Sequence, residues 1–213
     1  MMKALIFDLD GTLADTLRDI MDAMNHALAE RGLPVHDADA YRQFVGEGAS
    51  QLVRNALPPG HESRVPELLA AYRAFYLEHL IVHTQPYPGI RELLAELQAQ
   101  RLPLAVLSNK PHELTIRIVA ELFPDVPFVG VLGQRKDHPR KPDPSGALEL
   151  CHALGHPPAD VALVGDTRTD MQTARAAGML AIGVRWGFRD PPELLEHGAH
   201  HLIEKPTDLL LLA

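Results

Sequence analysis

Residues 1–16 read MMKALIFDLDGTLADT, and the apolar run in this stretch ends abruptly in two acids and a glycine. Residues 5–7 are all apolar, which is typical of a short strand buried on both faces. Asp8 and Asp10 are two positions apart, so their side chains point to the same side if the pleat of the strand continues through them. The stretch therefore predicts two carboxylates close together at the end of a core strand.

Two carboxylates so close repel each other, and the repulsion raises the pKa of one of them unless a cation neutralises the pair. Either one acid keeps its proton and serves as a proton donor, or a metal ion is bound by both. A site made of oxygen ligands suits Mg²⁺. The sequence of this pair alone leaves both interpretations open.

Two later segments repeat the pattern of an apolar run that ends in small polar or acidic residues. They are residues 102–109 (LPLAVLSN) and residues 160–167 (DVALVGDT). Amphipathic helical runs alternate with these strands, which predicts an α/β fold with a parallel sheet and helices on both faces. Ligands of such sheets bind beyond the carboxyl ends of the strands, so we expect the polar residues at the three ends to meet in one crevice.

Residues 15–85 interrupt this alternation, because they hold no strand-like run but three helical ones, the last extending from residue 65 to residue 83. The chain then returns through QPYPGI, where two prolines stiffen the connection. We therefore expect two domains: a core made of residues 1–14 and 86–213, and an inserted helical domain made of residues 15–85.

The composition excludes several classes of protein. The chain has 213 residues, 46% of them hydrophobic, a net charge of −8 and one cysteine. One cysteine cannot form an internal disulfide or a cysteine-based zinc cluster, and no N-terminal leader is visible, so we expect a cytoplasmic protein. No apolar stretch is long enough to cross a membrane, and the negative charge disfavours nucleic acid as a partner. The oligomeric state is not indicated.

The end of the second strand has the residues of an anion site. Ser108 and Asn109 precede KPHEL, where Pro111 suits a first helical position, so hydroxyl, amide and backbone N–H groups there can bind a phosphate. Lys141 adds a positive charge. A helix cap is the alternative interpretation of Ser108.

The end of the third strand supplies more acid. Asp166 ends the strand and Asp170 follows four residues later, and both could complete a metal site with the first acidic pair. The alternative interpretation is structural, because an acid in the first turn of a helix, such as Asp170, stabilises the helix by about 0.3–1 kcal/mol.

Taken together, FDLDGTLADT, LSNKP, RKPDP and GDTRTDMQTARAAG resemble, in order, the four motifs of the phosphatase branch of the haloacid dehalogenase superfamily. The resemblance implies a Rossmann-like core with a helical cap inserted after the first motif. It also implies that Asp8 is the nucleophile that becomes an aspartyl-phosphate and that Asp10 is the general acid and then the base. The metal ligands that it implies for Mg²⁺ are Asp8, Asp10, Asp166 and Asp170. The residues expected to bind the phosphate or the rest of the substrate are Gly11, Thr12, Gly46, Arg54, Ser108, Asn109 and the catalytic Lys141.

The cap segment FVGEGASQLVRNAL, which contains Gly46, Gly48 and Arg54, resembles that of phosphoglycolate phosphatases. We therefore expect a Mg²⁺-dependent hydrolase of a small phosphorylated metabolite, with 2-phosphoglycolate as its substrate. A hydrolase of another sugar phosphate or of pyrophosphate, a phosphotransferase such as a β-phosphoglucomutase, and a non-catalytic binding protein are the alternatives. Asp10 argues against a dehalogenase, which needs no proton donor.

Overall fold

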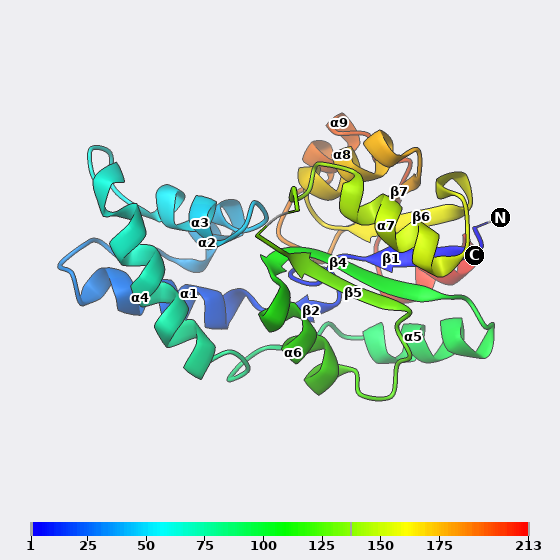
Figure 1. The fold of residues 1–213 in the computed structure, drawn as a ribbon, viewed down its shortest axis with the longest axis horizontal. Coiled ribbons are helices and arrows are strands. Elements are labelled where there is room, and N and C mark those ends of the chain that lie inside the picture. Colours follow the sequence, from blue (N-terminus) through cyan, green and yellow to red (C-terminus); the bar gives the residue numbers. More distant parts are fainter. Residues whose placement is uncertain (1, 137, 213) are drawn as a thin grey trace.

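The main sheet of the protein has six parallel strands in the order β5-β4-β1-β6-β7-β8 (Figure 1). The structure is a computed structural model that describes residues 2–136 and 138–212. The strands of this sheet are β1 (Ala4–Phe7), β4 (Leu104–Pro111), β5 (Gly130–Gln134), β6 (Val161–Gly165), β7 (Leu180–Val184) and β8 (His201–Ile203). The prediction of a parallel α/β core is confirmed.

Helices cover both faces of this sheet because the core strands are apolar on both sides. In β1, Leu5 and Phe7 belong to one buried cluster and Ala4 and Ile6 to another, as strand alternation requires. The first cluster includes residues of α5 (Ile90–Ala99) and α6 (His112–Leu122). The second includes residues of α7 (Ser145–Leu154), α8 (Arg168–Ala177) and α9 (Pro191–Glu196).

A group of four helices, here called the helical block, lies to one side of the sheet (Figure 1). Its members are α1 (Leu17–Ala29), α2 (Ala38–Phe44), α3 (Ala49–Ala56) and α4 (Val65–Glu78). Tyr41, Tyr72 and Tyr76 are buried among its helices. All four helices lie within residues 15–85, the range that the sequence predicts to be mostly helical.

A two-stranded antiparallel ribbon joins the helical block to the core. β2 (Ala14–Asp15) enters the block and β3 (Gln85–Pro86) leaves it, and Ala14 lies opposite Pro86. The interpretation of residues 15–85 as free of strand was wrong at its two ends, because Asp15 and Gln85 pair with each other. Strands of two residues carry no periodicity that a sequence pattern could detect.

The last helix of the block is shorter than the apolar run predicts, because α4 ends at Glu78 rather than at residue 83. The loop that follows is fixed by the buried carboxylate of Asp19 in α1, which accepts hydrogen bonds from the backbone N–H groups of Val82, His83 and Thr84 at 2.8–3.0 Å. The Thr84 hydroxyl donates to the same carboxylate at 2.7 Å. These bonds replace those that a longer helix would have made.

Among the described residues, the helices are all too short or too polar to cross a membrane.

Candidate active site

Three strand ends meet at one edge of the main sheet. Asp8 follows β1, Ser108 lies in the last part of β4, and Asp166 follows β6. β1 pairs with β4 on one side and with β6 on the other, and all three run in the same direction. The structure therefore brings together the residues that the sequence predicts at this edge.

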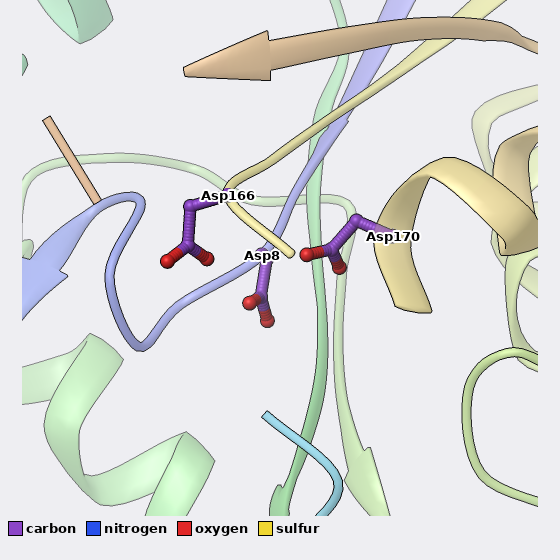
Figure 2. A group of neighbouring side chains, drawn as sticks. All are labelled: Asp8, Asp166 and Asp170. Atoms are coloured by element: carbon purple, nitrogen blue, oxygen red, sulfur yellow. The ribbon is translucent and has the colours of Figure 1, made fainter. Parts of the chain in front are cut away.

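The carboxylates of Asp8, Asp166 and Asp170 form an acidic group, shown in Figure 2. One oxygen of each lies within 4.8 Å of the others, and all three residues are buried. Carboxylate oxygens are the ligands that Mg²⁺ and related cations prefer. The donor set therefore fits a divalent cation, and these three residues could hold one.

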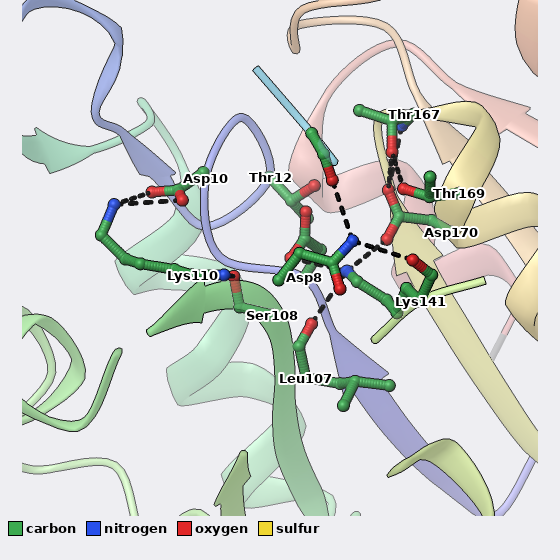
Figure 3. Close-up of polar contacts among 12 residues, drawn as sticks. Asp8, Asp10, Thr12, Leu107, Ser108, Lys110, Lys141, Thr167, Thr169 and Asp170 are labelled. Carbon is green, nitrogen blue, oxygen red and sulfur yellow. Dashed lines mark hydrogen bonds and ion pairs between the residues drawn. The ribbon is translucent and has the colours of Figure 1, made fainter. Parts of the chain in front are cut away.

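Lys141 is the counter-charge of the acidic group. Its ammonium lies 2.8 Å from Asp8 Oδ1 and 2.6 Å from Asp170 Oδ1 (Figure 3), and it donates to the backbone carbonyl of Leu107 at 3.0 Å. Burial on its own lowers the pKa of this lysine, but the charges of Asp170 and Asp8 outweigh burial and raise it above its usual range. Lys141 is therefore a permanent cation.

One ammonium does not neutralise three carboxylates. Burial raises the pKa of Asp8 to about 7, and the charges of Asp170 and Asp10 add to this while Lys141 opposes it. Burial, followed by the charges of Asp170 and Asp8, raises the pKa of Asp166 well above its ordinary value. A second cation would remove this repulsion, which agrees with the fit of a metal ion to the three oxygens.

Asp170 serves two structural purposes at once. Its Oδ2 accepts hydrogen bonds from the backbone N–H of Thr167 at 3.0 Å and from the Thr167 hydroxyl at 2.7 Å, which forms a capping box at the start of α8. Its Oδ1 accepts from Lys141. Asp170 therefore stabilises the start of α8, which is the alternative interpretation that the sequence left open. It is also a member of the acidic group.

Gly11 and Thr12 pack directly on the acidic group. Gly11 has φ +85°, and a Cβ there would lie 2.2 Å from Asp166 Oδ2, so both its conformation and its contact require glycine. The Thr12 hydroxyl donates to Asp166 Oδ1 at 3.3 Å. We predicted both as phosphate- or substrate-binding residues, and the structure places them beside Asp166; neither lines the pocket described below.

Asp10 lies apart from the acidic group. Its two oxygens accept hydrogen bonds from the ammonium of Lys110 at 2.9 Å and 3.1 Å (Figure 3). β1 ends at Phe7 and the chain then turns, with the N–H of Thr12 bonded to the carbonyl of Leu9 at 3.3 Å. The expectation that Asp8 and Asp10 share one pleat does not hold, because the strand ends before either of them.

Asn109 ties the site to the helical block. Its amide donates at 3.0 Å both to the carbonyl of Gly46, which precedes α3, and to the carbonyl of Lys141. Ser108 is buried, and its hydroxyl accepts from the backbone N–H of Lys110 at 3.2 Å. α6 begins at His112, one residue later than the sequence suggests.

A pocket opens between the core and the helical block. Its lining includes the predicted residues Asp8, Asp10, Gly46, Ser108 and Asn109. The block contributes apolar and aromatic side chains to it. These are Ile20, Val45, Ala49, Leu52, Tyr72 and Tyr76, and the block also contributes the exposed Arg73 of α4.

Arg54 takes no part in this pocket and is exposed near the end of α3. The sequence analysis did not predict Lys110 and Arg189, two cations that lie close to the site. Lys110 could have been noticed, since it directly follows the polar residues Ser108 and Asn109 in β4. Arg189 donates to the carbonyls of Gln43 and Val45 at 3.0 Å and 2.8 Å. No pattern marks such a residue, because its partners are backbone atoms far away in the chain.

Residues 5–184 match the family model of haloacid dehalogenase-like hydrolases. The chain belongs to this family. The match spans all three strand ends, the helical block and the acidic group, so the hydrolase family is shown by the same part of the chain that builds the site. Hydrolases of this family that act as phosphatases use a divalent metal, and the acidic group is where this member could bind it.

Individual relatives agree with this assignment. The hydrolase is 36% identical over 198 residues to the phosphoglycolate phosphatase of Chromobacterium violaceum. The alignment covers 91% of this chain and 89% of that protein. It is 32% identical over 211 residues to the phosphoglycolate phosphatase of Aquifex aeolicus, with 99% and 96% covered.

Solved structures show the same fold. A crystal structure from Lactobacillus delbrueckii subsp. bulgaricus has a TM-score of 0.92 at 33% identity, and the match covers 97% of this hydrolase and 96% of that chain. A haloacid dehalogenase-like hydrolase from Streptococcus pneumoniae has a TM-score of 0.90 at 27% identity, with 99% and 98% covered.

Proposed function

We propose that the protein is a Mg²⁺-dependent phosphatase that hydrolyses 2-phosphoglycolate through an aspartyl-phosphate on Asp8. The observation that carries the proposal is the meeting of Asp8, Lys141 and the other two acids beside Ser108 at the carboxyl edge of the sheet. Relatives named phosphoglycolate phosphatase that cover most of the chain support the substrate.

In the proposed mechanism a carboxylate oxygen of Asp8 attacks the phosphorus atom, and the bond to the glycolate oxygen breaks. Asp10 gives a proton to that leaving oxygen and later takes one from the water that attacks the aspartyl-phosphate. Lys141, Ser108 and Asn109 bind the phosphoryl oxygens, whose negative charge has to be balanced for the transfer to proceed.

Mg²⁺ bound by Asp8, Asp166 and Asp170 would supply positive charge that offsets the repulsion between an anionic nucleophile and an anionic substrate. Asp170 would act mainly as the partner that fixes Lys141, since both of its oxygens already accept hydrogen bonds. Asp10 is not proposed as a carboxylate ligand, because its side chain is bound by Lys110.

We also propose that the helical block, residues 15–85 in the predicted division, is the cap over a core made of residues 1–14 and 86–213. Two observations support this: the pocket is lined from both sides, and the β2–β3 ribbon lies at the predicted boundaries. A water-poor pocket between cap and core favours phosphoryl transfer to the intended acceptor. A cytoplasmic location is proposed with the function; Cys151 is free and buried, which is compatible with a reducing compartment.

The test is release of inorganic phosphate from 2-phosphoglycolate in the presence of Mg²⁺. We expect turnover by the wild type, none after addition of EDTA, and none by Asp8→Asn, which preserves the shape of the side chain. Asp39→Asn is the matched control, because its side chain is 96% exposed. Near-normal hydrolysis by Asp8→Asn would refute the assignment of Asp8 as the nucleophile.

The same assay separates the alternatives. β-Glucose 1-phosphate and pyrophosphate are tested alongside 2-phosphoglycolate. Formation of glucose 6-phosphate without release of phosphate would identify a phosphotransferase. Faster turnover of pyrophosphate or of a sugar phosphate than of 2-phosphoglycolate would reject the proposed substrate while leaving the phosphatase assignment in place.

A further inference from the structure

Lys110 is a buried cation in the pocket, and the mechanism above gives it no role. Its side chain is 4% exposed, and its ammonium holds the Asp10 carboxylate at 2.9 Å and 3.1 Å. The same ammonium lies 4.9 Å from the centre of the Tyr76 ring in α4, a cation–π contact. Lys110 therefore joins the proposed general acid to the helical block.

The ion pair conflicts with the work proposed for Asp10. Both oxygens of Asp10 are held by Lys110, yet one of them has to reach the leaving oxygen of the substrate. When Asp10 turns to the substrate, the ammonium of Lys110 stays buried without its partner. An unpaired buried charge is unfavourable, so a second anion that replaces the carboxylate of Asp10 would favour the movement.

A carboxylate on the substrate would be such an anion. Lys110 and Ser108 are two residues apart in β4, so their backbones are separated by about 6.6 Å at 3.3 Å per residue, and a short molecule can contact both. The Tyr76 hydroxyl is buried and has no hydrogen-bond partner within the described residues, so it is available as a second donor. Apart from Tyr72, Tyr76 and Arg73, the side chains that the block contributes to the pocket are apolar.

We propose that Lys110 is the residue that selects phosphorylated hydroxy acids, and that the substrate carboxylate replaces Asp10 as its partner and thereby releases Asp10 to the leaving oxygen. This inference rests on the proposed function. It explains why the lysine is paired with the general acid when no substrate is bound, and it makes substrate recognition and the availability of the acid one event.

The first experiment compares 2-phosphoglycolate with ethyl phosphate, in which a methyl group replaces the carboxylate. We expect the wild type to prefer 2-phosphoglycolate by at least about a hundredfold in kcat/KM, and Lys110→Gln to reduce that preference at least tenfold, which corresponds to about 1.4 kcal/mol. Loss of the Asp10 partner lowers both rates, so the ratio isolates recognition of the carboxylate. Lys110→Arg should retain part of the preference.

Lys3→Gln is the matched control, because this lysine is exposed and pairs with Asp160 at the surface. Its preference for 2-phosphoglycolate should equal that of the wild type. An unchanged preference in Lys110→Gln, with normal hydrolysis of 2-phosphoglycolate by the wild type, would overturn the role of Lys110 and leave the proposed function intact.

The second experiment does not depend on which ester is the substrate. Sulfoacetate and ethanesulfonate carry the same sulfonate, and only sulfoacetate carries a carboxylate. We expect sulfoacetate to inhibit hydrolysis of p-nitrophenyl phosphate by the wild type at least tenfold more strongly than ethanesulfonate, and Lys110→Gln to abolish the difference. Equal inhibition of the wild type would overturn the proposal even if 2-phosphoglycolate proves not to be the substrate.

Discussion

The ammonium of Lys141 lies 2.6 Å from Asp170 Oδ1, and the exposed fractions of the two side chains are 3% and 0%. Removing the lysine would leave the carboxylate buried without a counter-charge, and such a loss costs about 3–5 kcal/mol. We expect Lys141→Met to lower the free energy of unfolding by about this amount. Urea denaturation in the presence of EDTA measures it.

A double-mutant cycle gives the control for this pair. Adding Asp170→Asn to Lys141→Met should restore part of the lost stability, because the second change removes the charge that the first leaves unpaired. Effects of the two single substitutions that simply add would show that the pair is not coupled.

Stabilisation by Mg²⁺ should grow with pH. The pKa of Asp8 is raised to about 7 and that of Asp166 well above its ordinary value, both chiefly by burial. Below these values the folded protein holds protons that the unfolded chain, with ordinary pKa values near 4, has released. The metal-free protein therefore loses stability as pH rises from about 4 to about 7.

A cation bound by these acids has to displace the same protons at low pH. We expect the increase in Tm between EDTA and Mg²⁺ to be larger at about pH 8 than at about pH 5. Taking the difference at each pH cancels the titration of exposed groups such as Asp143 and Asp160. An increase that is the same at both pH values would contradict metal binding by the acidic group.

Asp19 should stabilise the return from the helical block to the core. Its buried carboxylate satisfies three backbone N–H groups and the Thr84 hydroxyl. Asp19→Ala leaves these donors without a partner, which costs about 1–3 kcal/mol, and the urea midpoint should fall accordingly. Asp22→Ala is the control, because Asp22 in the same helix is partly exposed and pairs with the exposed Arg18. Equal midpoints for the two variants would refute the role of Asp19.

Arg189 should matter for turnover although it lies outside the pocket lining. It holds the carbonyls of Gln43 and Val45 next to Gly46, and charge-assisted bonds of this kind are stronger than neutral ones. We expect Arg189→Met to lower kcat/KM for 2-phosphoglycolate roughly tenfold, about 1.4 kcal/mol, mainly through KM. Arg185→Met is the control, since Arg185 pairs with Glu204 at the surface. A similar loss in both variants would contradict the prediction.

The sequence predicted those parts of the molecule that repeat a local pattern. The apolar runs before Asp8, Ser108 and Asp166 determine three neighbouring strands, and their order in a parallel sheet brings the three ends together. The acidic group could therefore be predicted. The prediction that Asp10 lies beside Asp8 was wrong, because it extended the alternation of a strand past Phe7, where β1 ends.

Contacts between distant segments were not accessible in this way. The pairing of Lys110 with Asp10 joins residues 100 positions apart, and that of Arg189 with Val45 joins residues 144 apart. Nothing local distinguishes Arg189 from a surface residue, and nothing local indicates that Lys110 pairs with Asp10. Arg54 shows the opposite case, since it lies in a segment that resembles a family pattern, yet it is exposed and does not line the pocket.

The β2–β3 ribbon makes the helical block a module. The chain leaves and re-enters the core through residues that are paired with each other, Ala14 with Pro86 and Asp15 with Gln85. A short turn could link these ends without altering any pairing of the main sheet. Evolution can therefore exchange the helical block, and with it the range of substrates, while the catalytic residues of the core stay unchanged.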